Sequence, residues 1–542
     1  ERESDKDDFM KPRIIILLNS IDINRGGLTH ASLRQASTFA DAGYDTQILT
    51  FNYEPRFPII CKKLKEMGKV SNNVVIRNMF EEKALYGNKD KINMRKVKVK
   101  LSDYEKHYAI SQRKNHNAYR LYNNGLYEKY IALRKDDTLD FIDYFNENRY
   151  RVKRENYNYY GHMTRVQYFS FEENKVRQQL FFDKTGKAFL NFWKDPSTGK
   201  ISRVIHLGSN NNIISETTGD TIPHKIHWLK SVLNESNERI MAISDTRSTD
   251  ELLVKLKHPN TVRSLRMHSN HLKNPDNPDS ELNKRNGYAI ENIKNVDALI
   301  VLTDKQKHDI VNRFGLENKV HVIPNYYEAK APKPKGLKSI FINEKQDSTQ
   351  IKRDLSKVVI VSRFASIKNI DHTIQAFKKV VTEVPEAKLE IWGSGDQKDE
   401  YADLIKSLDL SDNVLIKGYT EHPEKIYQSG GLSVLTSNAE GFSLAVMESM
   451  ANSSPVVSYN IRYGPSDMIE DGVNGFLIDK SDIDALSEKM IHMLKKPEKT
   501  RDMGNEAKNT IQTKFSKEIY QKLWFSLTDT LLEVLERNNH NE

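Results

Sequence analysis

Short apolar segments alternate with helix-like segments over much of this sequence, and few folds accommodate that pattern. The run PRIIILLNSI (residues 12–21) has the continuous apolar character of a strand buried on both faces of a parallel sheet. A Gly turn, a helix-like segment and a second strand follow it in GGLTHASLRQASTFADAGYDTQILTF. Similar strands return at RIMAISDT, SLRMHSN, VDALIVLT and KVHVIPN. The pattern predicts a doubly wound, Rossmann-like α/β domain.

A second series of strand-like segments predicts a second α/β domain. Its members are KVVIVSRF, KLEIWGSG, VLIKGYT, LSVLTSN and PVVSYNI, each followed by a helical or turn segment. The stretch between Pro324 and Lys357 is rich in Lys, Pro and polar residues, as is typical of a linker. Apolar residues at nearly helical spacing in SKEIYQKLWFSLTDTLLEVLER predict a long final helix. A chain of 542 residues is also expected to form two or three domains.

The region between the two halves of the first α/β pattern differs from both. After residue 80 we expect charged helix-like sequence, and then an antiparallel β meander in KVRQQLFFDKTGKAFLNFWKDPSTGKISRVIHL, where two turn signals separate alternating strands. We therefore predict an insertion in the first domain. The expected domains are residues 10–80 with 216–330 (first α/β domain), 81–215 (β-rich insertion), 331–515 (second α/β domain) and 516–540 (helix packing back on the first domain).

The insertion is also the basic part of the chain. Residues 91–210 contain 24 Lys and Arg against 13 Asp and Glu, whereas the net charge of the whole chain is only +9. Twelve of the 24 tyrosines lie between Tyr104 and Tyr168. A basic, aromatic-rich module predicts a polyanionic partner.

Several classes of protein are disfavoured by composition. The sequence has no run of 18 apolar residues, and its charged start ERESDKDDFMKPR lacks the apolar core of a signal peptide. A single cysteine, Cys61, excludes an internal disulfide and a multi-cysteine metal site. We therefore expect a cytoplasmic protein.

Candidate phosphate-binding groups follow several of the predicted strands. Gly26 and Gly27 stand before a helix, where backbone N–H groups can approach a phosphate. Arg363 and Lys368 lie just beyond a strand and could together neutralise a diphosphate without a metal. Gly393 and Gly395, in IWGSGD, could let a nucleotide lie against the backbone. Each of these signals is weak when taken alone.

Two glutamates in the apolar stretch AEGFSLAVMESM (residues 439–450) complete the set. Glu440 follows a predicted strand and precedes Gly441, and Glu448 lies within a predicted helix. The turn places Glu440 at the carboxyl edge of the sheet, where open α/β sheets bind their ligands. Charged residues are rarely buried without a partner, so this location favours a ligand.

The joint spacing of these motifs resembles the retaining glycosyltransferases of family GT4, which have the GT-B fold of two facing α/β domains. The matching elements are Arg363–x4–Lys368, Gly393-x-Gly395, Glu440–x7–Glu448 and GPSDMIEDGVNGFLI, within residues 11–55 and about 240–510. GGLTHASL, HSNH (268–271) and YGPSDMIEDGVNGFLI (463–478) are most similar to the wall teichoic acid α-glycosyltransferases, which also carry a β-rich insertion.

The resemblance implies a role for each candidate. Glu440 would contact hydroxyls of the donor sugar, and Glu448 would accept hydrogen bonds from the ribose of UDP. Arg363 and Lys368 would stabilise the leaving diphosphate, so that neither a metal nor a cofactor is expected. His268 would lie near the donor sugar, with His271 as the less favoured alternative.

The resemblance also implies the partners. The donor would be UDP-glucose or UDP-N-acetylglucosamine, and the acceptor a teichoic acid polymer, with glucose and poly(glycerol phosphate) favoured over poly(ribitol phosphate). It implies a homo-oligomer, a trimer in this family, at the inner face of a Gram-positive membrane. No nucleic acid is expected as a partner.

Three further interpretations stay open from the residues alone. A nucleic-acid-binding protein would use the basic Tyr-rich segment to stack bases, but it leaves the paired glutamates unexplained. A structural role would use FFDKTGKAFLNFW as edge strands that build an oligomer. A transferase acting on another polysaccharide or on a protein is a third alternative.

Overall fold

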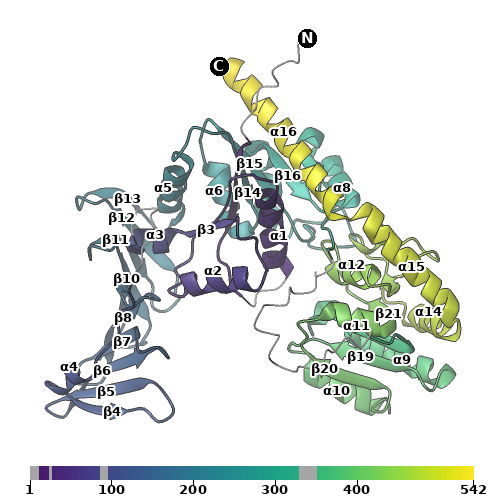
Figure 1. The fold of residues 1–542 in the computed structure, drawn as a ribbon, viewed down its shortest axis with the longest axis horizontal. Coiled ribbons are helices and arrows are strands. Elements are labelled where there is room, and N and C mark those ends of the chain that lie inside the picture. Colours follow the sequence, from purple (N-terminus) through teal and green to yellow (C-terminus); the bar gives the residue numbers. More distant parts are fainter. Residues whose placement is uncertain (1–10, 24–26, 86–94, 329–350, 542) are drawn as a thin grey trace, which may run out of the picture. The chain divides into compact units, whose positions relative to one another are not determined.

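The computed structural model describes residues 11–23, 27–85, 95–328 and 351–541, and the chain divides into two compact units. Unit 1 comprises the residues up to Arg263 together with 538–542, and unit 2 comprises Ser264–Arg537 (Figure 1). Gly26 and most of the predicted linker lie outside the described residues.

Unit 1 contains a parallel sheet built on the opening strand of the chain. Its strands lie in the order β14-β1-β2-β3, with Ile15 opposite both Ala242 and Gln47. All six residues of β1 are buried, which explains their continuous apolar character. The elements are β1 (Arg13–Leu18), α1 (Gly27–Asp41), β2 (Thr46–Thr50), α2 (Phe57–Glu66), β3 (Val75–Asn78), α3 (Met79–Leu85), α5 (Ile222–Leu233), β14 (Ile240–Ser244), η1 (Arg247–Thr249) and α6 (Asp250–Lys255).

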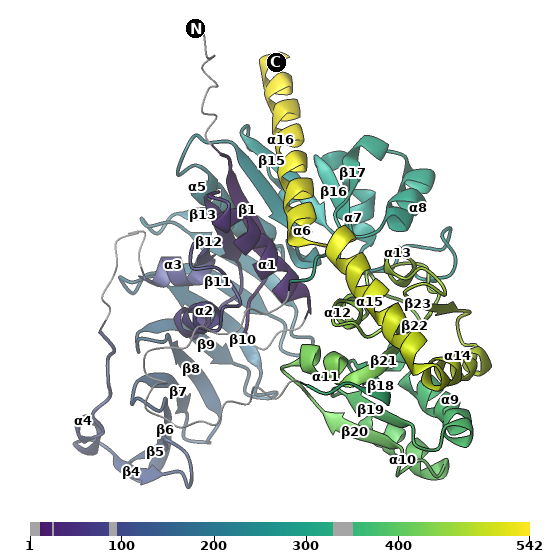
Figure 2. The ribbon, with the colours of Figure 1, turned by 45° about the vertical axis from the view of Figure 1, so that its right-hand side comes forward.

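The insertion is a single antiparallel sheet of ten strands, β4 to β13, in which each strand pairs with the next along the chain. Helix α3 lies beside this sheet (Figure 2). Phe181 of the sheet packs on Phe80 of α3 and on Tyr53, and Phe192 packs on His224 of α5. The strands are β4 (Ala109–Gln112), β5 (Ala118–Asn123), β6 (Leu126–Leu133), β7 (Leu139–Phe145), β8 (Arg151–Tyr157), β9 (Met163–Phe169), β10 (Val176–Phe182), β11 (Ala188–Lys194), β12 (Ile201–Leu207) and β13 (Ile213–Thr217), preceded by α4 (Ser102–Glu105).

Two expectations for the insertion are wrong. The sequence from 109 to 169 forms strands, not helices. The prediction failed because long cationic side chains cover aromatic rings on these strands, and the usual alternation of apolar and polar residues is therefore hidden. Lys153 lies over Tyr144 at 4.0 Å, and Arg154 lies over Phe141 at 3.9 Å. The segment FFDKTGKAFLNFW forms β10 and β11, which are interior strands; the edges of the sheet are β4 and β13.

Unit 2 contains the parallel strands β15, β16 and β17 and a second, six-stranded parallel sheet. The order of that sheet is β20-β19-β18-β21-β22-β23, and the second series of apolar segments predicts its strands β18 to β22. Its strands are β18 (Asp354–Val361), β19 (Lys388–Trp392), β20 (Val414–Gly418), β21 (Gly430–Leu435), β22 (Val456–Tyr459) and β23 (Gly475–Ile478), and the other three are β15 (Thr261–Arg266), β16 (Ala298–Val301) and β17 (Val320–Val322).

Helices cover this sheet and close the chain. Buried Ile374, Phe377 and Val380 of α9 pack with the strands and with Met490 of α14 in one core. In α16, Tyr520 packs on Tyr326, and Trp524 lies 5.5 Å from the guanidinium of Arg266. The helices of unit 2 are α7 (Gly287–Glu291), η2 (Ile293–Asn295), α8 (Asp304–Phe314), η3 (Glu317–Lys319), η5 (Ser366–Lys368), α9 (Ile370–Glu383), α10 (Lys398–Ser407), α11 (Pro423–Ser429), α12 (Leu444–Ala451), α13 (Pro465–Met468), α14 (Ile483–Lys495), α15 (Pro497–Lys514) and α16 (Lys517–Asn541).

Strand order predicts where this sheet binds a ligand. β18 lies between β19 and β21, so the connections run in opposite directions on its two sides. Open α/β sheets bind ligands outside the carboxyl ends of the strands at such a switch point. The relevant loops are those that follow β18 and β21.

Candidate functional site

The loops at this switch point bring two of the predicted residues together. Lys368 ends η5 after β18, and Glu440 follows β21. The Lys368 Nζ atom donates a hydrogen bond of 2.5 Å to Oε1 of Glu440, and each side chain is 16% exposed. Residues 72 positions apart therefore form one half-buried ion pair at the carboxyl edge of the sheet.

The backbone around this pair is held by several hydrogen bonds. The hydroxyl of Thr436, just after β21, donates to the carbonyls of Lys368 and Asn369 at 2.9 and 2.8 Å. The amide of Asn369 donates in return to the carbonyl of Thr436, and the N–H of Asn438 donates to the carbonyl of Ile367. The two loops thus form one rigid unit, which is what a preorganised charge pair requires.

Arg363 lies in the same loop as Lys368 but is exposed. None of the carboxylates in the described parts of the chain forms an ion pair with it. The Lys368 cation is therefore held in place, whereas the Arg363 guanidinium is available to a ligand.

Gly393 and Gly395 let the loop after β19 approach the loop after β18. A Cβ atom at Gly393 would lie 1.8 Å from the carbonyl oxygen of Ser362, and one at Gly395 would lie 2.4 Å from that of Phe364. Both glycines also have φ near +150°, which other residues rarely adopt. Loop packing accounts for both glycines, so contact with a nucleotide is not needed to explain them.

Glu448 lies on α12, about one turn beyond the start of that helix, and is partly exposed. Burial, and next the charge of Glu448, raise the pKa of Tyr427, whose side chain is fully enclosed. Tyr427 lines a small open pocket at the carboxyl ends of β18 and β21. The other lining residues are Ile360, Val361, Ser362, Ser433, Val434, Leu435, Ala445, Val446 and Val456.

His268 follows β15 and lies against the turn that carries Glu440. A Cβ atom at Gly441 would lie 2.0 Å from the carbonyl oxygen of His268, so only glycine allows this contact. The structure therefore places His268, Glu440 and Lys368 in neighbouring segments of unit 2. His271 is 1% exposed and stacks on Tyr463, and burial lowers its pKa to about 4, which suits a structural histidine.

The predicted phosphate loop of unit 1 is described only in part. Helix α1 begins at Gly27, as the Gly-Gly signal predicts. Nothing further in the described residues bears on a role for Gly26 or Gly27.

Three residues of this region were missed by sequence reasoning. Ser443 precedes α12 with φ of +75° and is 3% exposed, and its hydroxyl has no partner among the described residues. Left-handed backbone at a non-glycine residue is strained and is common at functional sites. Buried Asp309 and partly exposed Arg462 form an ion pair between α8 and the turn after β22. Ser443 lies within the quoted stretch 439–450 and Arg462 directly precedes the quoted motif that starts at Tyr463, whereas no sequence motif marks Asp309.

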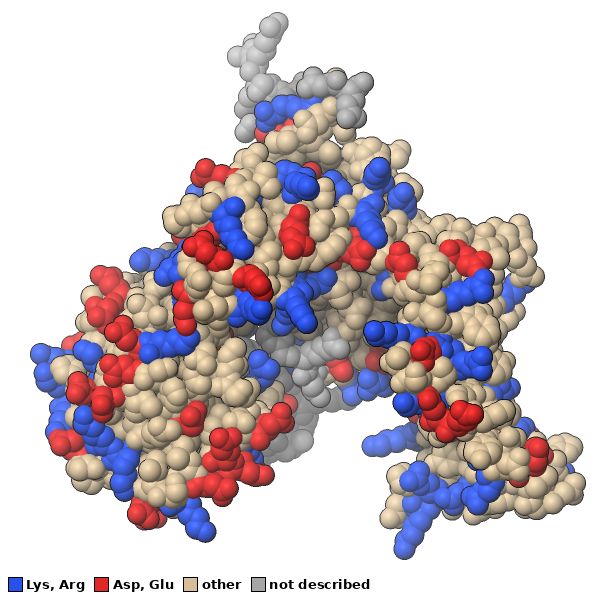
Figure 3. All heavy atoms as spheres, turned by 180° about the vertical axis from the view of Figure 1, so that it is seen from behind, with Lys and Arg blue, Asp and Glu red and all other residues tan. Residues whose placement is uncertain are grey.

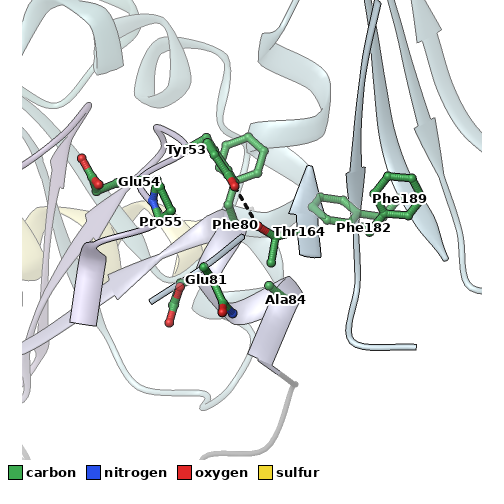
Figure 4. Close-up of a pocket in the computed structure, with 10 residues that line it drawn as sticks. Tyr53, Glu54, Pro55, Phe80, Glu81, Ala84, Thr164, Phe182 and Phe189 are labelled. Atoms are coloured by element: carbon green, nitrogen blue, oxygen red, sulfur yellow. Dashed lines mark hydrogen bonds between the residues drawn. The ribbon is translucent and has the colours of Figure 1, made fainter. Parts of the chain in front are cut away.

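A separate pocket lies in unit 1, between α3 and the antiparallel sheet (Figure 4). Aromatic rings of Phe80, Phe182 and Phe189 line it, and the hydroxyl of Tyr53 hydrogen-bonds to that of Thr164 at 2.7 Å. Burial raises the pKa of Glu81, on its wall, to about 8. This pocket contains none of the predicted site residues.

The described residues contain neither a membrane-spanning helix nor a cluster of metal ligands. None of the helices there combines the length and apolarity needed to cross a bilayer. In the same ranges, His, Cys, Asp and Glu side chains form no group of three or more suited to a metal ion.

Comparison with known proteins identifies the class of protein to which this site belongs. Residues 341–510 match the family model of group 1 glycosyl transferases. The poly(ribitol-phosphate) α-N-acetylglucosaminyltransferase of Staphylococcus aureus (strain COL) is 29% identical over 518 residues, covering 95% of this chain and 99% of the relative. The poly(glycerol-phosphate) α-glucosyltransferase of Bacillus subtilis (strain 168) is 25% identical over 528 residues, covering 94% of this chain and 74% of the relative.

Solved structures agree with this result. A crystal structure of a S. aureus TarM mutant in complex with fondaparinux, α-GlcNAc-glycerol and UDP matches with a TM-score of 0.78 and 27% identity, covering 95% of this chain and 99% of the other. The match confirms the predicted fold class and favours the transferase over the nucleic-acid-binding alternative. The chain is therefore a glycosyltransferase with the GT-B fold, of the kind represented by the wall teichoic acid α-glycosyltransferases.

Proposed function

We propose that this protein transfers glucose or N-acetylglucosamine from a UDP-sugar to hydroxyls of a polyol-phosphate polymer, with retention of the α configuration. The observation that carries the proposal is similarity along 94–95% of the chain, insertion included, to two transferases that act on such polymers. Similarity confined to the second α/β domain would have supported only a nucleotide-sugar-dependent enzyme.

Glu440 and Lys368 act on the donor sugar and the leaving group. A carboxylate at the carboxyl edge of the sheet accepts hydrogen bonds from sugar hydroxyls and so orients the reacting carbon. Its hydrogen bond with Lys368 fixes the carboxylate before the donor arrives and leaves the other ammonium protons free to donate. Removing either residue leaves the charge of the other without the hydrogen bond that holds it in position.

Three features stabilise the diphosphate as its charge develops. Lys368 supplies a fixed positive charge, and exposed Arg363 supplies a planar fork that can contact two phosphate oxygens. Helix α12 begins next to the same turn, and the N-terminus of a helix carries a partial positive charge. These groups can neutralise the leaving group, and on that basis we propose transfer without a metal.

Glu448 binds the ribose of the nucleotide. It lies about one turn along α12 and so further from the turn that carries Glu440 than the start of the helix does. Burial, and next the charge of Glu448, raise the pKa of Tyr427, which lines the pocket beside β18 and β21. A carboxylate there can accept two hydroxyl hydrogen bonds, which matches the 2′ and 3′ hydroxyls of a ribose. His268 then hydrogen-bonds to the donor sugar beside Glu440.

The antiparallel sheet binds the polyanionic acceptor. Lys and Arg side chains gather on its tip, at the lower right of the face drawn in Figure 3. In the segment that precedes α4, Lys96 is already paired, since it lies 2.5 Å from Asp136, but Lys98 and Lys100 are exposed. The edge strand β13 exposes Ile213 and Ile214, and we extend the proposal to a homo-oligomer that uses the edges of this sheet.

The test is a release assay for UDP with two donors and two acceptors. UDP-glucose and UDP-N-acetylglucosamine are each incubated with poly(glycerol phosphate), with poly(ribitol phosphate) and without polymer. We expect one combination at least to release UDP well above the rate without polymer, with sugar attached to the polymer. Equal release in all arms, with no sugar on either polymer, would overturn the proposal.

A further inference from the structure

Asp309 is a buried carboxylate that the proposed reaction does not use. It lies on α8 with 6% exposure, and its oxygens accept three hydrogen bonds. Arg462 donates from Nε at 2.6 Å and from Nη2 at 2.8 Å, and the hydroxyl of Tyr463 donates at 2.7 Å. Burial alone would raise the pKa of Asp309, but these hydrogen bonds hold it below its usual value, so the group stays charged. Because Arg462 binds both carboxylate oxygens, the ion pair fixes the orientation of the turn after β22 relative to α8 as well as the distance between them.

The same face of α8 also holds the segment that carries His268. Gln306, one turn before Asp309, donates from Nε2 to the carbonyl of Ser269 at 3.0 Å and lies 3.3 Å from Nδ1 of His271. The ring of His271 in turn stacks on Tyr463, with 5.9 Å between ring centroids. One helix thus contacts the segment 268–271 and the turn 462–464 at once.

Two glycines then connect these segments to Glu440. A Cβ atom at Gly464 would lie 2.4 Å from the carbonyl oxygen of Phe442, and one at Gly441 would lie 2.0 Å from that of His268. Backbones packed this closely cannot shift independently. A displacement of the turn 462–464 must therefore move the segment 440–443, and with it Glu440 and His268.

We propose that Asp309 is a positioning residue of the transferase, which acts through Arg462 and Tyr463 to hold His268 and Glu440 in register with each other. The proposal rests on the proposed function for its catalytic consequence. A buried ion pair adds little net stability compared with apolar packing, but it specifies one arrangement strongly. Misplacement of about 1 Å at a reacting centre can lower a rate by about a hundredfold.

The test compares Asp309→Asn with two other variants. Asn keeps the size of the side chain and can still accept from Tyr463, but it removes the charge that Arg462 requires. Tyr463→Phe keeps the stack on His271 and removes one hydrogen bond. Thr500→Val is the control, because it removes a buried hydrogen bond of 2.7 Å to the carbonyl of Met493, between α15 and α14, and lowers stability away from the site.

We expect Asp309→Asn to lower kcat by about tenfold to a hundredfold with little change in donor KM. Tyr463→Phe should give a smaller loss of kcat, and Thr500→Val should lower Tm without changing kcat. The decisive arm repeats Asp309→Asn in a His268→Ala background, where its effect should be smaller because the part that acts through the position of His268 is already lost. An equal loss of kcat in both backgrounds, or an equal loss in Thr500→Val, would overturn the proposal.

Hydrogen exchange separates this proposal from the proposed function. Amides of 267–272 and 440–443 should exchange faster in Asp309→Asn than in Thr500→Val, measured well below both Tm values. If the wild-type protein transfers no sugar but this exchange pattern holds, the function is wrong and the positioning network stands. If the protein is active and exchange in both segments is unchanged, the network is wrong.

Discussion

Replacing Glu440 by Gln tests the charge pair at the switch point with little change of shape. Gln retains an oxygen that can accept from Nζ of Lys368, now 2.5 Å from the carboxylate, so the loops after β18 and β21 should remain in place. The variant loses the negative charge that orients the donor. Loss of one preorganised polar group in an active site costs about 2.7–4 kcal/mol, which corresponds to about a hundredfold to a thousandfold in kcat.

Lys368→Ala should lower transfer by at least about a hundredfold for the complementary reason, because it removes the fixed cation next to the diphosphate. It should also cost more stability, since it leaves a carboxylate of 16% exposure without its partner. Steady-state rates and Tm of both variants measure the two effects separately.

Glu390→Gln is a matched control for both variants. Glu390 of β19 pairs with Lys357 of β18 in the same sheet, at 3.8 Å and with side chains 16% and 17% exposed, but neither residue lies on the loops of the site. Its kcat should equal that of the wild type. Wild-type rates in Glu440→Gln and Lys368→Ala, or an equal loss in Glu390→Gln, would refute the assigned roles.

Four further outcomes are expected. Glu448→Ala should raise donor KM and abolish the thermal shift with UDP; an unchanged shift would remove Glu448 from the ribose site. EDTA should leave activity nearly unchanged, and a loss reversed by Mg²⁺ would contradict transfer without a metal. The pKa of Glu81 is about 8 in the folded protein and 4.5 in its ordinary state, so between these values the folded chain keeps a proton that the unfolded chain has lost. The contribution of Glu81 to the free energy of unfolding therefore falls as pH rises from about 4.5 to about 8. Glu81→Gln should flatten that part of the profile of Tm against pH, and parallel profiles would be the contrary result. Polymer KM should rise steeply with salt concentration while donor KM changes little. The double variant Lys98→Glu, Lys100→Glu should make polymer KM less dependent on salt. A polymer KM of the wild type that does not change with salt would exclude acceptor binding by counterion release.

The elements that sequence reasoning recovered are those in which burial decides the residue types. β1 and β21 are buried at every position, so their apolar runs mark them directly. Glu440 and Lys368 could be found because both follow such strands. The strands of 109–169 could not, because cations lie over the rings of Tyr144 and Phe141 and replace ordinary apolar alternation.

Contacts between distant segments were beyond the reach of the sequence. Nothing near Asp309 shows that it meets Arg462, 153 positions away, or that Gly441 faces the carbonyl of His268. Gly393 and Gly395 illustrate the converse case. Their pattern is that of a nucleotide-binding loop, but the approach of Ser362 and Phe364 already requires glycine at both positions.

The most direct measurement of the central claim is the structure of the product. Poly(glycerol phosphate) and poly(ribitol phosphate) are each incubated with the protein and the donor that releases UDP fastest, and the purified polymer is analysed by NMR. The account predicts a new anomeric signal with the small coupling of an α-linked hexose, connected through the glycosidic bond to a polyol carbon. A β-linked sugar, or an unmodified polymer alongside released free sugar, would contradict it.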